Sequence, residues 1–348
     1  MRSVFKKSLA CLVALTMFVC VFVVSGYAAE QSEDAIIYTC LGDSIAAGFG
    51  TTGYQSHRIP APNAYHSLVA ESLGAQLINF GSAGFRTNEM RYILDPDYNE
   101  RDTAYEIGLE SLGIREFQLD EIREDMINAI KSSDLITIEL GANDCFTGYT
   151  STLGEIRRSN YFTEQKEQFA NNEQILSILS SVESAIKTYR YITTYIQYII
   201  KVLPMFKENW DAVVKNIRIY NPDATIIAIG LCNVLGNMST KEDSKFKFGS
   251  LLDAAFDAFS NYIERKSPYH NEYIFCDISD LELGDIPTST FTGRFAFQDP
   301  DFVVTILRKI HPNDEQHALI ATRIVELVQR NGLGMIDAST PWWKTYFK

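Results

Sequence analysis

Five short runs of β-branched and other apolar residues recur along the chain. Polar positions hardly interrupt them, and such uninterrupted runs are typical of strands buried on both faces of a parallel sheet. The runs are Ala35–Cys40, Gln76–Phe80, Leu135–Leu140, Thr225–Leu231 and Glu272–Cys276.

Between these runs, apolar residues three or four positions apart predict amphipathic helices. The segments are Asn63–Leu73, Leu119–Lys131, Leu251–Arg265 and Asp314–Gln329, and Asn313 is placed to cap the last one. Strands that alternate with helices indicate an α/β fold. We therefore expect a three-layer α/β/α sandwich around a five-stranded, mostly parallel sheet.

Two stretches exceed what a minimal α/β unit needs. The first, Arg91–Phe117, is polar, and the second is an insertion at about 146–206. The later part of the insertion has a helical pattern, which Pro204 is expected to end or kink. One interpretation is an ordinary amphipathic helix that covers the sheet. The other is a cap over a binding site, in which tyrosines line an acyl or sugar pocket; these tyrosines are Tyr191, Tyr195 and Tyr198.

The N-terminus has the layout of a secretory signal peptide. Three cationic residues precede the uncharged run Leu9–Val24, and small residues surround Ala28. We expect cleavage after residue 28, hence a secreted or cell-surface protein whose main domain spans 29–333. An uncleaved anchor helix is the alternative, but the run of about 16 residues is shorter than the ~20 that span a bilayer. Residues 334–348 form an aromatic tail, which either docks on the domain or contacts another surface.

Composition narrows the classes of function. Hydrophobic residues make up 46% of the 348, which is enough for a sizeable core, and the formal net charge is −13. Loss of the three signal-peptide cations would give −16 (−13 − 3). An acidic chain without a basic patch is not expected to bind nucleic acid. Four cysteines would remain, and their places in or beside strand-like runs favour buried free thiols over disulfides.

Polar and glycine-rich motifs follow three of the predicted strands and precede the last helix. They are Gly42-Asp43-Ser44, Asn79 to Gly84, Gly141-Ala142-Asn143-Asp144, and His311-Pro312-Asn313. Ligands of open parallel sheets bind beyond the carboxyl ends of the strands. The four motifs are therefore predicted to converge at one edge of the sheet.

In order and in place, these motifs resemble the four conserved blocks of the SGNH hydrolases, the GDSL-like lipase/acylhydrolase group. The resemblance covers about Ala35 to Arg330, apart from the two long stretches, and implies a flavodoxin-like SGNH fold. It implies that Ser44 is a nucleophile and His311 its general base. It also implies that the tetrahedral oxyanion is bound by the Ser44 and Gly84 backbone N–H groups and by the Asn143 side chain.

The chemistry explains these residue types, although each has a simpler interpretation. A serine hydroxyl needs an adjacent base, and an oxyanion needs preorganised donors. Ser44 alone would suit a helix N-cap, Gly84 a turn, and Asn143 a turn or cap. Asp43 and Asp144 are expected to hold loops through hydrogen bonds to backbone. Of the other histidines, His317 is expected at the surface of its helix.

One position departs from the family pattern. Three residues before the histidine, where an aspartate usually orients the base, stands Arg308. Three interpretations remain: the Arg308 backbone carbonyl orients His311, Asp299 or Asp301 folds back to it, or the enzyme is impaired.

The resulting hypothesis is a carboxylic ester hydrolase that needs no metal or organic cofactor and acts on a small-molecule, glycan or lipid ester. Its alternative is a non-catalytic ligand-binding protein on the same scaffold. A nucleotide or phosphate binder is disfavoured because the sequence has no glycine-rich phosphate loop. The oligomeric state is left open.

Overall fold

A computed structural model describes residues 35–56, 59–103, 105–106, 119–145, 159–232, 248–270, 272–281 and 311–333. Every described helix and strand belongs to one compact unit that begins at Ile37. The predicted signal peptide and the aromatic tail lie outside the described residues. Within the described part, no helix is both long enough and apolar enough to cross a membrane.

The core of the fold is a five-stranded sheet in the order β2-β1-β3-β4-β5. All its neighbouring strands run parallel, which confirms the predicted sheet. The bounds are β1 Ile37–Gly42, β2 Gln76–Gly81, β3 Leu135–Glu139, β4 Thr225–Ile229 and β5 Ile274–Cys276. Every residue of β3 and β4 is buried, as expected for strands covered on both faces.

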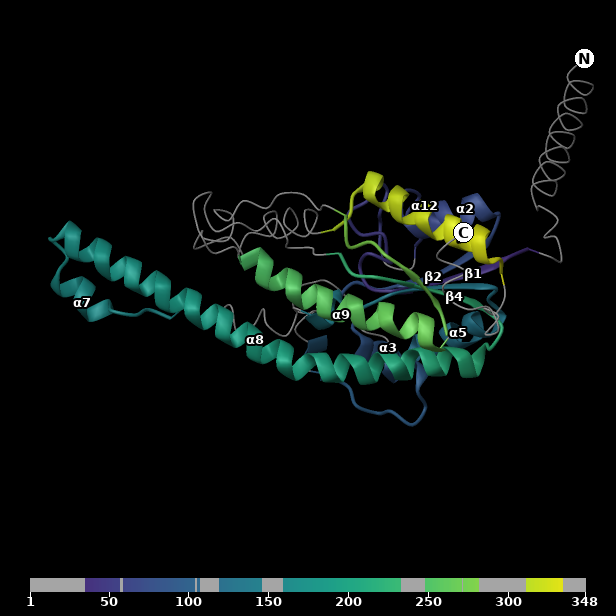
Figure 1. The fold of residues 1–348 in the computed structure, drawn as a ribbon, viewed down its shortest axis with the longest axis horizontal. Coiled ribbons are helices and arrows are strands. Elements are labelled where there is room, and N and C mark those ends of the chain that lie inside the picture. Colours follow the sequence, from purple (N-terminus) through teal and green to yellow (C-terminus); the bar gives the residue numbers. More distant parts are fainter. Residues whose placement is uncertain are drawn as a thin grey trace, which may run out of the picture. The chain divides into compact units, whose positions relative to one another are not determined.

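Helices cover both faces of the sheet, so the three-layer prediction is correct (Figure 1). One face carries α2 (Tyr65–Leu73) and α12 (Asp314–Asn331), which pack on each other. The other face carries the remaining large helices, with α8 packed against its neighbours. They are α3 (Thr87–Leu94), α5 (Leu119–Ser132), α8 (Glu173–Tyr220) and α9 (Phe248–His270). The short α7 (Thr163–Gln168) precedes α8.

Pro204 was expected either to end or to kink its helix, and it does not end α8. It continues through Pro204 to Tyr220, for 48 residues in all. Proline disfavours a helix interior because it lacks an N–H and crowds the preceding turn. Here the following residues bury a row of large side chains against the sheet and α9, and this packing outweighs the local cost. The row consists of Phe206, Trp210, Val213, Val214 and Ile217.

The four cysteines of the described chain are free and buried, as the sequence predicted. Burial raises the pKa of each thiol, to about 11 for Cys40 and about 12 for Cys145, Cys232 and Cys276. These thiols act as small apolar core residues and stay protonated at neutral pH.

The strand order indicates where on the sheet a ligand would bind. The chain leaves β1 with a neighbouring strand on either side, β2 and β3. At such a switch point the connecting loops diverge above the carboxyl ends of the strands, where α/β proteins bind their ligands. The first three motifs of the sequence follow β1, β2 and β3.

Candidate active site

The predicted serine and histidine lie together at this edge. Ser44 follows β1 by two residues, and His311 precedes α12 by three. The Nε2 atom of His311 is 2.7 Å from the Ser44 hydroxyl oxygen, although 267 positions separate them in the chain. Both side chains are partly exposed, so a ligand can reach them.

A tight turn holds Ser44 above the sheet. The Asp43 N–H donates to the Glu139 carbonyl (3.1 Å), and the Ile45 N–H donates to the Asp43 carboxylate (2.9 Å). Gly42 allows the close approach, because a Cβ there would lie 2.3 Å from the Glu139 carbonyl oxygen and its φ is +155°. The loop-holding role predicted for Asp43 is therefore observed.

The His311 ring is packed by the loop that follows the serine. The Phe49 ring lies 4.7 Å from the imidazole, centroid to centroid. A Cβ at Gly50, where φ is +98°, would lie 3.1 Å from the His311 Cβ. The same loop is tied to the first turn of α12, because the Thr52 N–H donates to the Asp314 carboxylate (2.7 Å). Serine and histidine are thus positioned by one shared loop.

Helix α12 has a complete N-terminal cap just beyond His311. The Asn313 side chain accepts from the Gln316 N–H (3.0 Å), and the Gln316 side chain accepts from the Asn313 N–H (2.8 Å). This capping box satisfies two backbone donors of the first turn and confirms the predicted cap. The candidates for orienting His311, which are Asp299, Asp301 and the Arg308 carbonyl, lie outside the described residues.

Asn143 joins the three strand-end loops. Its Nδ2 group donates to the Asp43 carboxylate and to the Phe85 carbonyl, both at 3.0 Å. Both amide hydrogens are therefore engaged within the protein, and one must be released before Asn143 can donate to a ligand. Gly84 lies in the loop beside Phe85 with φ of +81°, a conformation that favours glycine.

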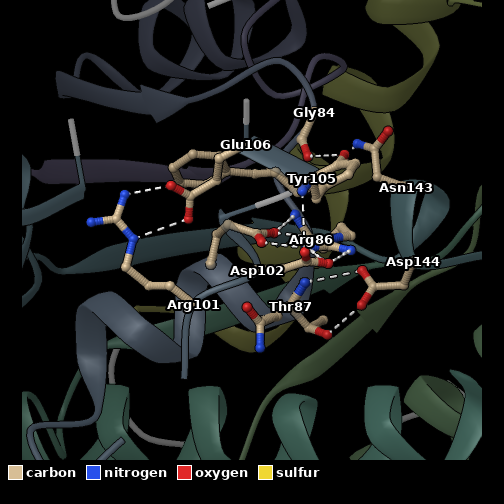
Figure 2. A network of polar contacts seen from close by, with 12 residues as sticks. Gly84, Arg86, Thr87, Arg101, Asp102, Tyr105, Glu106, Asn143 and Asp144 are labelled. Carbon is tan, nitrogen blue, oxygen red and sulfur yellow. Dashed lines mark hydrogen bonds and ion pairs between the residues drawn. The ribbon is translucent and has the colours of Figure 1, made fainter. Parts of the chain in front are cut away.

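A second set of polar contacts includes Gly84 (Figure 2). The Tyr105 hydroxyl donates to the Gly84 carbonyl (2.7 Å), and the Arg86 guanidinium lies 3.6 Å from the centroid of the Tyr105 ring. Arg86 is itself fixed by ion pairs with Glu89 (2.7 Å) and Asp102 (3.1 Å). Sequence reasoning missed Tyr105, which lies in the stretch read as a long polar segment.

Asp144 fastens the start of α3. It is buried and accepts from the Thr87 N–H (3.0 Å) and hydroxyl (2.6 Å). Burial raises its pKa to about 7, although these hydrogen bonds and the nearby Arg86 act in the opposite direction. Asp144 is therefore structural, as predicted.

A buried carboxyl pair lies under the serine turn. Asp43 and Glu139 are both fully buried, and burial raises the pKa of each. The charge of Asp43 raises the pKa of Glu139 further, well above its usual range. Two close carboxyl groups in a dry site do not both ionise. Glu139 is therefore the neutral member, and Asp43 carries the charge that Asn143 and Ile45 stabilise.

The prediction that His317 lies at the surface is wrong. The side chain is completely buried, and its Nδ1 accepts from the Tyr65 N–H (3.1 Å). Burial lowers the pKa of His317 to about 3 and that of the equally buried His66 to about 4. Both rings are thus neutral structural groups beside the serine loop, where a Cβ at Gly48 would lie 3.4 Å from His66.

The described residues include no group of three or more His, Cys, Asp or Glu side chains that could hold a metal ion. At the carboxyl edge of the sheet, the described residues with reactive or hydrogen-bonding groups are Ser44, His311 and the donors around them.

A parallel α/β sheet with a serine–histidine pair at its carboxyl edge is an architecture of hydrolases. Residues 40–319 match the model of the GDSL-like Lipase/Acylhydrolase family. The chain belongs to this family and is a hydrolase of ester bonds, an esterase or acylhydrolase. A comparison with curated proteins finds no match.

Several solved structures are distantly similar. The extracellular lipase of Streptomyces rimosus is 14% identical, with a TM-score of 0.48 over 85% of this chain and 99% of that one. Phospholipase A1 of Streptomyces albidoflavus NA297 is 15% identical, with a TM-score of 0.47 over 85% and 98%. A Corynascus thermopiles carbohydrate esterase family 2 enzyme is 14% identical, with a TM-score of 0.41 over 86% and 67%. These likenesses are remote, and the family assignment rests on the sequence match.

Proposed function

We propose that this protein is an exported serine esterase in which Ser44 is the nucleophile and His311 the general base. The observation that carries the proposal is the 2.7 Å separation of the His311 Nε2 and the Ser44 Oγ. At this distance a neutral imidazole accepts the hydroxyl proton while the oxygen attacks an ester carbonyl. Packing by Phe49 and Gly50 limits the movement of the ring.

In the first half of the reaction, Ser44 Oγ bonds to the ester carbon and its proton moves to His311. The tetrahedral intermediate then expels the alcohol, which takes that proton, and an acyl-serine remains. In the second half, water attacks the acyl group and gives its proton to His311. The acid then leaves, and the proton returns to Ser44. The cycle consumes one water and needs no further reactant.

The oxyanion is assigned to the backbone N–H groups of Ser44 and Gly84 and to the Asn143 side chain. Asn143 would exchange its contact with the Phe85 carbonyl (3.0 Å) for the oxyanion and keep its contact with Asp43. A charged acceptor is the stronger partner, so the exchange favours the transition state over the resting enzyme. Loss of one such donor costs roughly 2.7–4 kcal/mol of transition-state stabilisation.

The sequence supports export, because residues 1–28 have the layout of a signal peptide. An exterior location directs the choice of substrate toward esters of glycans or lipids. The net charge of −13 favours neutral substrates over anionic ones. A mass for the secreted protein that begins at residue 29 would establish cleavage, whereas a mass that includes residues 1–28 would refute it.

The test is hydrolysis of p-nitrophenyl acetate, butyrate and octanoate by the exported chain and its variants. Ser44→Ala and His311→Ala should each lower kcat by at least a thousandfold with the fold intact. Ser72→Ala is a matched control, because Ser72 is exposed on α2 and its hydroxyl bonds only its own helix. A fluorophosphonate should label Ser44 in the wild type. A folded wild type that hydrolyses no ester and takes no label would favour the non-catalytic binding protein instead.

A further inference from the structure

Helix α8 extends well past the sheet it covers. Near its C-terminus, Asn221 donates to the Ser133 carbonyl (2.8 Å), just before β3 begins. Further toward its N-terminus, the Tyr198 hydroxyl donates to the carbonyl of Asp144 (2.7 Å), which follows the end of β3. The helix residues before Tyr198 therefore project beyond the carboxyl edge, for about 37 Å at 1.5 Å per residue. We call α7 and residues 173–197 of α8 the arm (Figure 1).

One side of the arm is held by its own contacts. Glu183 forms ion pairs with Lys166 of α7 and with Lys187 (3.2 Å to the latter). The Arg190 guanidinium contacts the Tyr161 hydroxyl, just before α7. These contacts cover one face of α8 and leave another face to solvent.

The solvent face carries large apolar side chains in a single row. Ile178, Val182, Tyr189, Ile196 and Ile200 are 62%, 42%, 67%, 40% and 68% exposed. At 100° per residue these five positions fall within about 40° of one another around the helix. Single exposed apolar residues are ordinary, but an aligned row of five marks a contact surface. We call this row the apolar stripe.

The apolar stripe is symmetric about its centre. Val182 and Ile196 lie seven residues on either side of Tyr189, and Ile178 and Ile200 lie eleven residues on either side. Eleven residues make three turns of nearly straight helix, so the row stays on one face over about 33 Å. Reversing the direction of the helix therefore leaves the pattern unchanged.

We propose that the apolar stripe binds a second copy of this chain through an antiparallel, two-fold symmetric pairing of the two α8 helices. In this pairing Tyr189 meets Tyr189 of the second copy at the axis. Ile178 meets Ile200 of the second copy, and Val182 meets Ile196 of the second copy. Such a surface is self-complementary, which is the requirement for a closed two-fold dimer.

Charge supports an apolar protein partner over a lipid surface. Between positions 173 and 201 of α8, the charged residues are Glu173, Glu183, Lys187, Arg190 and Lys201. By helical geometry each lies at least about 100° from the centre of the apolar stripe. Interface cores are depleted of charge, whereas helices that lie on membranes have a strongly charged polar face rich in Lys and Arg. Here two acids offset the three cations, so the polar face has a net charge of only +1 (3 − 2). Small residues flank the stripe instead, among them Ser181 and Ala185, and permit close approach.

An antiparallel pairing also keeps the two bodies apart. A parallel pairing would bring two domains of the same negative charge together at one end of the helices. The accessible surface of a helix about 10 Å across lies on a cylinder about 13 Å in diameter, because the probing water adds its own radius. A third of that circumference over about 33 Å is on the order of 450 Å² per copy. The total of about 900 Å² lies near the lower limit of specific interfaces, so the dimer is reversible, with a Kd on the order of 1–100 µM.

The first test is sedimentation velocity of the full exported chain from 1 to 200 µM. We expect a concentration-dependent monomer–dimer equilibrium that strengthens with salt, because the stripe is apolar and the bodies repel. Tyr189→Glu should weaken dimerisation at least tenfold, since it places two carboxylates at the axis. Ile219→Glu is the matched control, because Ile219 is equally exposed on α8 (62%) but far from the stripe. A wild type that stays monomeric up to 200 µM overturns the proposal.

The second test determines the register by oxidative cross-linking. Tyr189→Cys should cross-link to itself, whereas Ile178→Cys should cross-link only when mixed with Ile200→Cys. The four native thiols of the described chain are buried and should not react. Self-cross-linking of Ile178→Cys would show a parallel pairing and refute the proposal. So would equal dimerisation by Tyr189→Glu and the wild type, with folding checked by circular dichroism.

Discussion

Removal of the Tyr105 hydroxyl tests whether the Gly84 loop is held in place for catalysis. The hydroxyl donates to the Gly84 carbonyl at 2.7 Å, and the ring supports the Arg86 guanidinium. Tyr105→Phe removes the hydrogen bond and keeps the ring. A neutral hydrogen bond contributes about 0.5–1.5 kcal/mol. If the stabilisation of the transition state falls by that amount, kcat falls about 2- to 12-fold, at 1.36 kcal/mol per tenfold.

The assay compares kcat and KM on p-nitrophenyl butyrate with the free energy of unfolding in urea. A positioning role predicts a lower kcat with KM changed less than twofold, because the Gly84 N–H acts mainly on the transition state. Tyr220→Phe is a matched control: its hydroxyl donates to the Leu94 carbonyl at 2.8 Å, in a partly buried place away from the serine. Both variants should lose similar stability. If both keep the wild-type kcat, or both lose it equally, Tyr105 does not position the loop.

Three further substitutions test the supports of the site. Gly50→Ala should lower kcat at least tenfold, because the new Cβ would lie 3.1 Å from the His311 Cβ. Gly74→Ala is the control, because Gly74 also has a positive φ (+62°) but no atom within 4 Å of the added Cβ. It should keep kcat and show the effect of backbone strain alone. Glu139→Gln should keep kcat/KM within about threefold, since Glu139 is already neutral, and a hundredfold loss would show that its ionised form matters. His317 has a pKa of about 3 in the folded chain, against about 6.5 when unfolded, so between these pH values the unfolded chain binds more protons. The free energy of unfolding should therefore fall as the pH drops through this window. For this ring the loss is roughly 2 kcal/mol at pH 5. His317→Asn keeps an acceptor for the Tyr65 N–H and should remove that part of the acid loss; an unchanged dependence between pH 7 and pH 5 would contradict the assignment.

Much of the sheet was predictable because a strand buried on both faces has few alternatives to an apolar run. The positions of β3 and β4 show this, since all their residues are buried. The meeting of Ser44 with His311 was also predictable, because the parallel topology places strand ends at one edge. For these elements the local pattern and the global fold agree.

The remaining features depend on contacts that no local pattern records. Tyr105 acts on a backbone carbonyl 21 positions away, and a carbonyl has no sequence signature. The continuation of α8 past Pro204 depends on packing against the sheet, which outweighs local propensity. His317 is different, because a usable signal was present. It lies three, four and seven residues before the buried Ile320, Ala321 and Ile324 and therefore shares their face of α12.

The four buried thiols of the described chain can report where the fold opens first. A thiol reagent can reach a sealed cysteine only after the surrounding segment opens, so each rate of modification reports a local opening free energy. Cys276 lies on β5, an edge strand of three residues, whereas Cys40 lies on β1 with a neighbour on both sides. Cys276 should therefore be modified faster than Cys40. The order in which the cysteines react would give the order in which the strands of the sheet open.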